Sequence, residues 1–175
     1  GAAALFTGGG ITAIGFEALA NNDASTLNTA VGYQALKATT FGSSNTAVGH
    51  SAMVATVGGY DNTAVGRSAM ADNTAGHGNT AIGVLSAWHN IDGDDNVAVG
   101  FSALRDNTAG NNNVAVGTSA AEGFAGSGIT AVGHQAAANT TADGNTAIGY
   151  NALRVNSTGE FNTAVGYKAL ELSST

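Results

Sequence analysis

Cysteine and proline are both absent from the 175 residues of this chain. The lack of cysteine excludes disulfides and thiolate metal sites, and it leaves the redox compartment open. The lack of proline suits a chain whose backbone N–H groups are all needed in hydrogen-bonded ladders. Aromatic residues make up only 6% of the chain while glycine numbers 26, so a bulky globular core is excluded as well.

Basic residues are also scarce: five Lys and Arg stand against twelve Asp and Glu, which gives a formal net charge of −7. Nucleic acids and anionic membranes select for clustered Lys and Arg, so neither is an expected partner. No apolar run approaches the roughly 18 to 20 residues of a membrane span, and the sequence shows neither a starting Met nor the pattern of a signal peptide. We therefore predict no membrane insertion by this segment, and we expect no cofactor.

One motif recurs along the whole chain, in forms such as NTAVGYQAL at 28–36 and NTAVGYKAL at 162–170. The spacing of its glycines is 17, as from Gly15 to Gly32, except for two intervals of 16, and Gly1 precedes Gly15 by 14. The motif glycines are Gly15, Gly32, Gly49, Gly66, Gly83, Gly100, Gly117, Gly133, Gly149 and Gly166. A fixed period of this size indicates stacked structural units. We predict a single repeat domain over 1–175, with about ten full coils and partial coils at both ends, cut from a longer fibrous protein.

Positions are numbered here from this motif glycine, which is position 0. Position −2 is Ala in all ten full copies, position −1 is only Val or Ile, and positions −4 to 0 carry no charge. Neighbouring side chains of a strand point to opposite faces, so we expect a strand that is dry on both faces. The predicted core or interface residues are Ala30, Val31, Gly32, Ala47, Val48, Gly49, Ala64, Val65, Gly66, Ala81, Ile82, Gly83, Ala98, Val99, Gly100, Ala115, Val116 and Gly117.

The pattern predicts an all-β fold: a parallel β-solenoid, or β-roll, with a coil period of about 17 and two short strands per coil. Apolar residues at helical spacing are absent, and each Gly inside a helix costs about 1 kcal/mol. Identical positions of coils stacked about 4.7 to 4.9 Å apart form columns. Position −4 then predicts a ladder of side-chain amides at a turn, broken by Ile11 and Ile129. Its members are Asn28, Asn45, Asn62, Asn79, Asn96, Asn113, Asn145 and Asn162.

The second dry face of the strand predicts contact with other chains, since small Ala and Gly permit close approach and closed rotational symmetry buries the strip on every chain. The strings NVAVG, NTAIG and NTAVG, followed by two residues and AL, resemble the head repeats of trimeric autotransporter adhesins, and more closely the Ala-Val-Gly repeats of some bacteriophage tail fibres. The resemblance covers nearly the whole chain. The adhesin repeat is shorter, and its length is matched here only by the interval between Gly1 and Gly15.

This resemblance implies left-handed parallel β-rolls wound as a homotrimer around one axis, with the apolar strand toward the centre. It implies a structural or adhesive shaft of an extracellular fibre on a cell surface or virion, without catalysis. The implied partners are further copies of the chain and a host-surface protein or glycan. The sequence does not choose between a bacterial adhesin and a phage fibre.

Three other functions fit parts of the pattern. An ice-binding solenoid needs regular paired Thr columns, whereas position −3 supplies one column interrupted by Val97 and Val114. A hexapeptide-type acyltransferase repeats its motif three times per coil of 18, not once per 17, and the four histidines share no Ser or Asp partner spacing. These are His50, His77, His89 and His134. A carbohydrate-cleaving β-helix needs a wider coil and a carboxylate pair in a cleft.

Two irregular stretches supply candidate sites. Asp92, Asp94, Asp95 and Asn96 offer hard oxygen ligands for Ca²⁺, with a solvated turn as the alternative. The stretch GVLSAWHN at 83–90 has an extra residue before its Ala, which predicts a bulged coil padded by Trp88, or a receptor contact through that ring. The column at position +1 varies, and its aromatic rings serve either packing between chains or surface contact. The candidate contact residues are Tyr33, Trp88, Phe101, Tyr150 and Tyr167.

Overall fold

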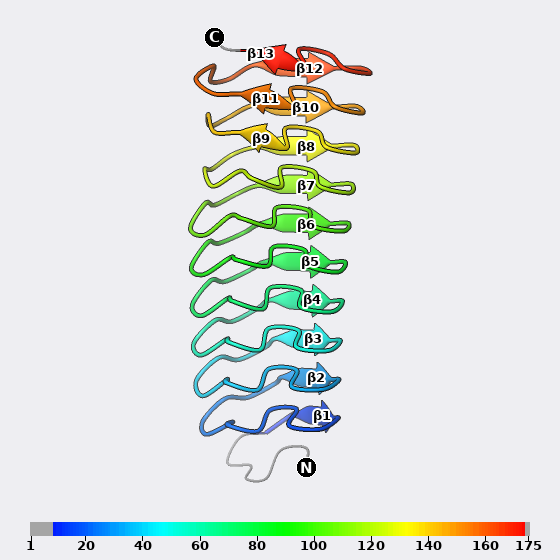
Figure 1. The fold of residues 1–175 in the computed structure, drawn as a ribbon. Helices are drawn as coiled ribbons and strands as arrows, with labels where there is room; N and C mark the ends of the chain where they lie inside the picture. Colours follow the sequence, from blue (N-terminus) through cyan, green and yellow to red (C-terminus); the bar gives the residue numbers. More distant parts are fainter. Residues whose placement is uncertain (1–8, 174–175) are drawn as a thin grey trace.

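The computed structural model describes residues 9–173, which wind into one parallel β-solenoid with its strands stacked along a single column (Figure 1). Each coil contributes one three-residue strand, and these ten strands form one parallel sheet. In stacking order they are β1 (Thr12–Ile14), β2 (Thr29–Val31), β3 (Thr46–Val48), β4 (Thr63–Val65), β5 (Thr80–Ile82), β6 (Val97–Val99), β7 (Val114–Val116), β8 (Thr130–Val132), β10 (Thr146–Ile148) and β12 (Thr163–Val165). The predicted all-β solenoid, with one motif period per coil, is confirmed.

Every strand pairs with its neighbour in register, so that like positions lie above one another: Thr29 pairs with Thr46, and Ala30 with Ala47. The two shortened coils keep this register, because Val114 pairs with Thr130 and Thr130 with Thr146. The missing residue is absorbed in the loop that precedes the strand. Residues at the same repeat position therefore form columns along the sheet. These columns build the surfaces described below.

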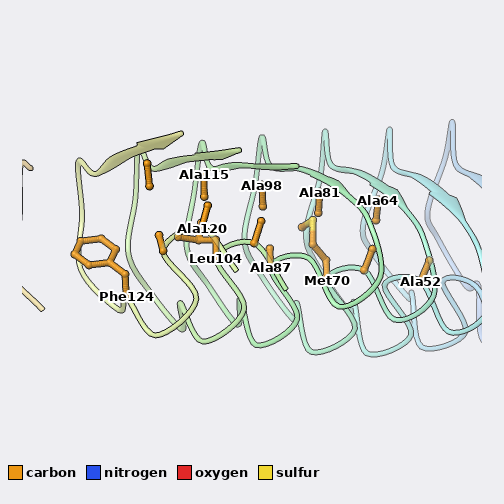
Figure 2. Close-up of a cluster of buried hydrophobic side chains, with 14 of the residues drawn as sticks. Ala52, Ala64, Met70, Ala81, Ala87, Ala98, Leu104, Ala115, Ala120 and Phe124 are labelled. Atoms are coloured by element: carbon orange, nitrogen blue, oxygen red, sulfur yellow. The ribbon is translucent and has the colours of Figure 1, made fainter. Parts of the chain in front are cut away.

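The strand has one buried face. Its central Ala, such as Ala98, points inward and is fully buried, while the residues on either side of it point outward. The Ala at position +3 and the Leu or Met at position +4 approach from the opposite wall, as Ala120 and Leu104 do in Figure 2. The single chain thus covers one face of the strand and leaves open the face that we expect to pack on another chain, because the coil is too thin to cover its own outer surface. The structure assigns Ala to the core and Val or Ile to the outside.

The second strand predicted for every coil occurs in only three of the described coils. A separate parallel sheet contains β9 (Asn139–Thr140), β11 (Val155–Asn156) and β13 (Leu172–Ser173), in the order β13, β11, β9. In every coil the residues at +2 and +4 have positive φ angles, such as 55° at Gln34 and 51° at Leu36. Such angles lie outside the β region, so this wall turns twice within a few residues instead of extending. Hydrogen bonds between coils continue there nonetheless, as from Leu36 N to Ala52 O at 3.0 Å.

The motif glycine makes the turn at the end of each strand. Gly32 has φ of 136°, a region open essentially to glycine alone. A Cβ at this position would overlap the carbonyl oxygen of Gly49 in the next coil. The repeat therefore requires glycine here twice over, for its backbone angle and for the close stacking of coils. Within residues 9–173 no helix is present that is long and apolar enough to cross a bilayer.

Candidate interaction surface: the strand face and its two edges

The outward side chains at positions −3 and −1 form a continuous surface along the sheet, which we call the strand face. Position −3 is Thr or Val and position −1 is Val or Ile, so none of the ten strands places a charge on it. Val65 and Ile82 are 37% and 42% exposed. A repeated column of half-exposed β-branched residues leaves an apolar strip open on the single chain, and such strips mark interaction surfaces.

One side of the strand face is bordered by the glycine edge, which consists of the motif glycine and the two residues after it. Position +1 here carries a column of rings stacked from coil to coil. Their centroids are 5.5 Å apart for Phe16 and Tyr33, 4.9 Å for Tyr33 and His50, 5.0 Å for His134 and Tyr150, and 5.4 Å for Tyr150 and Tyr167. The rings of Tyr33 and Tyr150 are each covered on both faces by their neighbours, so they are not open for stacking on a sugar ring.

The other predicted contact residues lie in different settings. Phe101 is 51% exposed on the glycine edge, between Val84 and Thr118 of the adjacent coils. Trp88 lies at position +5, on the wall opposite the strand, and its ring stacks on His89 at 4.1 Å. The structure therefore does not bring the five predicted contact residues together.

The expected bulge beside Trp88 is also wrong. Ser86 occupies the position of the usual Ala and Ala87 that of the usual Leu, and both are buried. The interval from Gly83 to Gly100 equals that of the regular coils, so nothing is inserted. The hydroxyl of Ser86 donates to the Gly83 carbonyl at 3.0 Å, which satisfies the polar group that replaces a methyl.

The opposite border of the strand face is the loop edge, comprising positions −9 to −5. A ladder of side chains holds it together, in which the residue at −6 accepts a hydrogen bond from the backbone of the preceding coil. The His77 N–H donates to Asp94 Oδ1 at 2.7 Å, and the Asp94 N–H donates to Asn111 Oδ1 at 2.6 Å. This ladder was not predicted from the sequence, although an oxygen- or nitrogen-bearing side chain at nearly every −6 position was its signal.

This ladder accounts for the acidic stretch that was the candidate calcium turn. Asp94 accepts from His77, Asp95 takes a left-handed backbone conformation with φ of 55°, and Asn96 is buried. The Asn96 amide donates to the Gly110 carbonyl at 2.8 Å, so its side chain points into the solenoid. Among the residues that the structure describes, no group of three or more His, Cys, Asp or Glu is placed to hold a metal ion.

Inside the loop edge, the predicted asparagine ladder is confirmed. The Asn62 N–H donates to Asn45 Oδ1 at 3.0 Å, and the Asn62 side-chain amide donates to the Gly76 carbonyl at 2.7 Å. A second buried column at position +7 faces it and was missed: the Asn73 amide donates to the same Gly76 carbonyl at 3.2 Å. Each such loop carbonyl can thus accept two amides.

The break in the asparagine ladder at Ile129 has a matching change in the second column. The same coil carries Phe124 at position +7, and both side chains are fully buried. Both polar columns are therefore replaced by apolar residues in one of the two shortened coils. The ring of Phe124 fills the interior there, pointing in from its wall (Figure 2).

Charge is divided unequally around the coil. Seven of the twelve acidic residues lie on the loop edge, which has no Lys or Arg: Asp23, Asp61, Asp92, Asp94, Asp95, Asp143 and Glu160. The other five lie on the glycine edge and the wall opposite the strand, where all five basic residues also lie; four of them form ion pairs with Lys or Arg, and the fifth, Asp72, lies beside His89. Formal charges there cancel, so the net charge of −7 resides on the loop edge.

Hydrogen bonds and ion pairs, some within one coil and some between coils, set the direction of the resolved pKa shifts. Hydrogen bonds from the Arg105 guanidinium lower the pKa of Asp106 and raise the pKa of Arg105 itself; Nε and Nη2 lie 2.9 and 2.7 Å from the two carboxylate oxygens. Asn151 and then Lys168 lower the pKa of Glu171, and Lys37 and then Gln34 lower the pKa of Glu17.

The histidines occupy three different positions around the coil. Only one of their rings lies beside a carboxylate among the described residues: His89 Nδ1 lies 2.6 Å from Asp72 Oδ2 in the preceding coil. His50 and His134 belong to the stacked rings of the glycine edge, and Tyr60 N–H donates to His77 Nδ1 at 3.3 Å on the loop edge. Residues 9–173 form no pocket that gathers them.

Comparison with known proteins gives no match to any family model, any curated protein or any solved structure.

Proposed function

We propose that this chain is a shaft segment of an extracellular fibre, in which three copies wind in parallel with their strand faces toward a common axis. Its role is structural or adhesive and involves no catalysis. The proposal includes left-handed winding and a place on a cell surface or virion, both of which rest on the resemblance of the repeats to adhesin heads and phage tail fibres.

The observation that supports it best is the strand face itself. Its column at position −1 is apolar, and the whole face is uncharged and continuous over ten coils and is left open by the single chain. A surface of this kind is stabilised by burial, at about 25 cal/mol for each Å² of apolar area removed from water. Position −1 accepts only Val or Ile although its side chain lies outside the coil's own core. Such a restriction at an exposed position fits an interface between chains.

A second candidate function is binding to ice, and one observation favours it. The Thr side chains of position −3 line the strand face in register from coil to coil, broken by Val97 and Val114. This function needs the face open to solvent, whereas assembly covers it. The acyltransferase alternative gains nothing from the structure, because the histidines are dispersed and no pocket forms among the described residues.

The test is the mass of the purified chain in solution. Light scattering or sedimentation equilibrium should give about three times the 17.0 kDa of one chain. A stable folded monomer would overturn the trimeric shaft. Thermal hysteresis of ice growth should be absent, and its presence in a monomeric protein would favour the ice-binding function instead.

A further inference from the structure

The strand face lies between two different edges, and this geometry dictates what meets in the proposed trimer, on which the present inference rests. Strand β4 runs from the loop edge to the glycine edge, as all ten strands do in Figure 1. When three such faces surround one axis, the glycine edge of each copy meets the loop edge of the next. In an assembly of three copies with rotational symmetry, every contact joins two different surfaces. Contacting residues of neighbouring copies lie at the same height along the axis.

The two edges that meet in this way differ in charge. The loop edge carries seven carboxylates and no Lys or Arg. The glycine edge carries Arg67 and Lys168, and its one carboxylate, Glu17, already forms an ion pair with Lys37 at 2.7 Å. An acidic border thus lies opposite a border that is neutral to basic, and such complementarity guides the choice of partner surface.

Arg67 stands out on the glycine edge. Of the five Lys and Arg, it is the one that forms no ion pair with another residue of 9–173, and it is exposed. Asp61, on the loop edge of the same coil, is likewise exposed and makes no ion pair. Six residue steps separate the two along an extended segment, roughly 20 Å at about 3.3 Å per step, so they do not reach each other within one chain.

We propose that Arg67 of one copy pairs with Asp61 of the adjacent copy, and that this pair fixes the axial register of the assembly. The positions that correspond to Asp61 in the coils below and above are Ser44 and Gly78, neither of which carries a charge. The strand face is nearly identical from coil to coil, so it discriminates weakly against a shift of one coil. A shifted heterologous contact does not close and leads to an open filament, and the ion pair disfavours that shift.

Cross-linking tests this contact cleanly because the chain has no cysteine. The double variant His50→Cys with Ser44→Cys leaves the proposed ion pair in place, because these residues hold positions +1 and −5 in the coil before that of Arg67 and Asp61. It should give a covalent trimer with a short bismaleimide, since each copy links to the next around the ring. The matched variant His50→Cys with Leu27→Cys, one coil out of register, should give mainly uncross-linked chain. Equal cross-linking of both variants, or a trimer by mass with no cross-link in the first, would overturn the register pair while leaving the trimer intact. A monomer by mass would overturn the proposed function as well.

Charge exchange provides a second measurement that needs no cross-linker. Arg67→Glu should lower the melting temperature of the assembly by about 2 to 4 °C, and addition of Asp61→Arg should restore it. Asp92→Arg is the control, because Val84 and Phe101 lie at its level on the glycine edge and offer no base to repel. Failure of the second substitution to rescue the first would contradict the pair.

Discussion

At the scale of single residues, the backbone angle at each position of the repeat limits which residue types can stand there. The motif glycines have φ angles between 125° and 139° and stack on one another from coil to coil. Position +4 also has a positive φ angle but is not glycine: Leu104 has φ of 52°, and its side chain is fully buried. A left-handed conformation costs a non-glycine residue roughly 1 to 2 kcal/mol, whereas burial of a Leu side chain gains about 1.5 to 3. The core contact outweighs the strain, so Leu and Met persist there.

Replacement of Gly100 by Ala should destabilise the fold by about 3 kcal/mol or more. Its φ is 133°, and a Cβ would meet the Gly117 backbone in the next coil. Gly58→Ala is the matched control, because its backbone is not left-handed and no atom lies within 4 Å of the new Cβ. Denaturant unfolding of both variants measures the difference. Equal stability of the two would mean that the coils do not stack as closely as the structure has them.

The pair of Asp106 with Arg105 predicts a dependence on pH. The lowered pKa of Asp106 means that its stabilising contribution is present above the unfolded value of about 3.9 and is lost as the pH falls through the lower, folded value. The carboxylate is partly exposed, so the contribution stays below about 1 kcal/mol. Asp106→Asn should therefore be slightly less stable than the natural chain at neutral pH and equal to it well below pH 4. Asp92→Asn, which breaks no ion pair, should show no such convergence in unfolding experiments.

At the scale of the repeating element, the coil is held by two opposed walls and by paired polar columns inside the loop edge. The amides of Asn79 and Asn90 donate to the Gly93 carbonyl at 2.8 and 2.9 Å. In the coils of Thr39 and Thr56 the second donor is missing, and their buried hydroxyls have no partner among the described residues. The residue type at position +7 thus decides whether the loop carbonyl of a coil accepts one side-chain amide or two.

Replacement of Thr56 by Asn should stabilise the fold by about 0.5 to 1.5 kcal/mol, because it supplies the missing amide donor to the Gly59 carbonyl and removes an unpaired hydroxyl. Thr140→Asn provides the contrast. The Thr140 hydroxyl already donates to the Leu153 carbonyl at 2.9 Å, so its replacement should bring no gain. Melting temperatures of the two variants decide the matter, and a loss of stability in Thr56→Asn would refute the shared-carbonyl arrangement.

At the scale of the whole molecule, the single chain is a thin rod with a packed core and one face left open to solvent. Its core is built from Ala, Leu and Met, and its outer strip of Val, Ile and Thr remains open. The proposed trimer covers that strip with the strand faces of the other two copies. Assembly and stability are therefore expected to depend on the same residues.

Replacement of Val99 by Asp distinguishes the proposed trimer from a monomeric rod, because the two predict different effects of the substitution. Val99 is partly exposed in the single chain, so a carboxylate there would cost little in a monomer. In a trimer it is buried on three chains, and each unpaired carboxylate costs several kcal/mol. The expected result is loss of the assembly in mass measurements together with a large fall in melting temperature. Asp106→Ala, away from the strand face, should keep the trimeric mass, and an intact trimer of Val99→Asp would exclude this face as the interface.

The sequence by itself determined the period, the solenoid, the strand and the asparagine ladder, because a column repeated ten times shows directly which positions tolerate only one kind of residue. It also located Ile129 as a break in that ladder. It did not reveal Phe124 as the matching change, since the two meet only when the loop closes. Which of Ala98 and Val99 faces inward was likewise decided by the tertiary structure: alternation along a strand separates two faces but does not say which one the opposite wall covers. The second strand was lost for a related reason, because the left-handed angles at Gln34 and Leu36 come from the turn that the coil must make, not from the preferences of Gln or Leu.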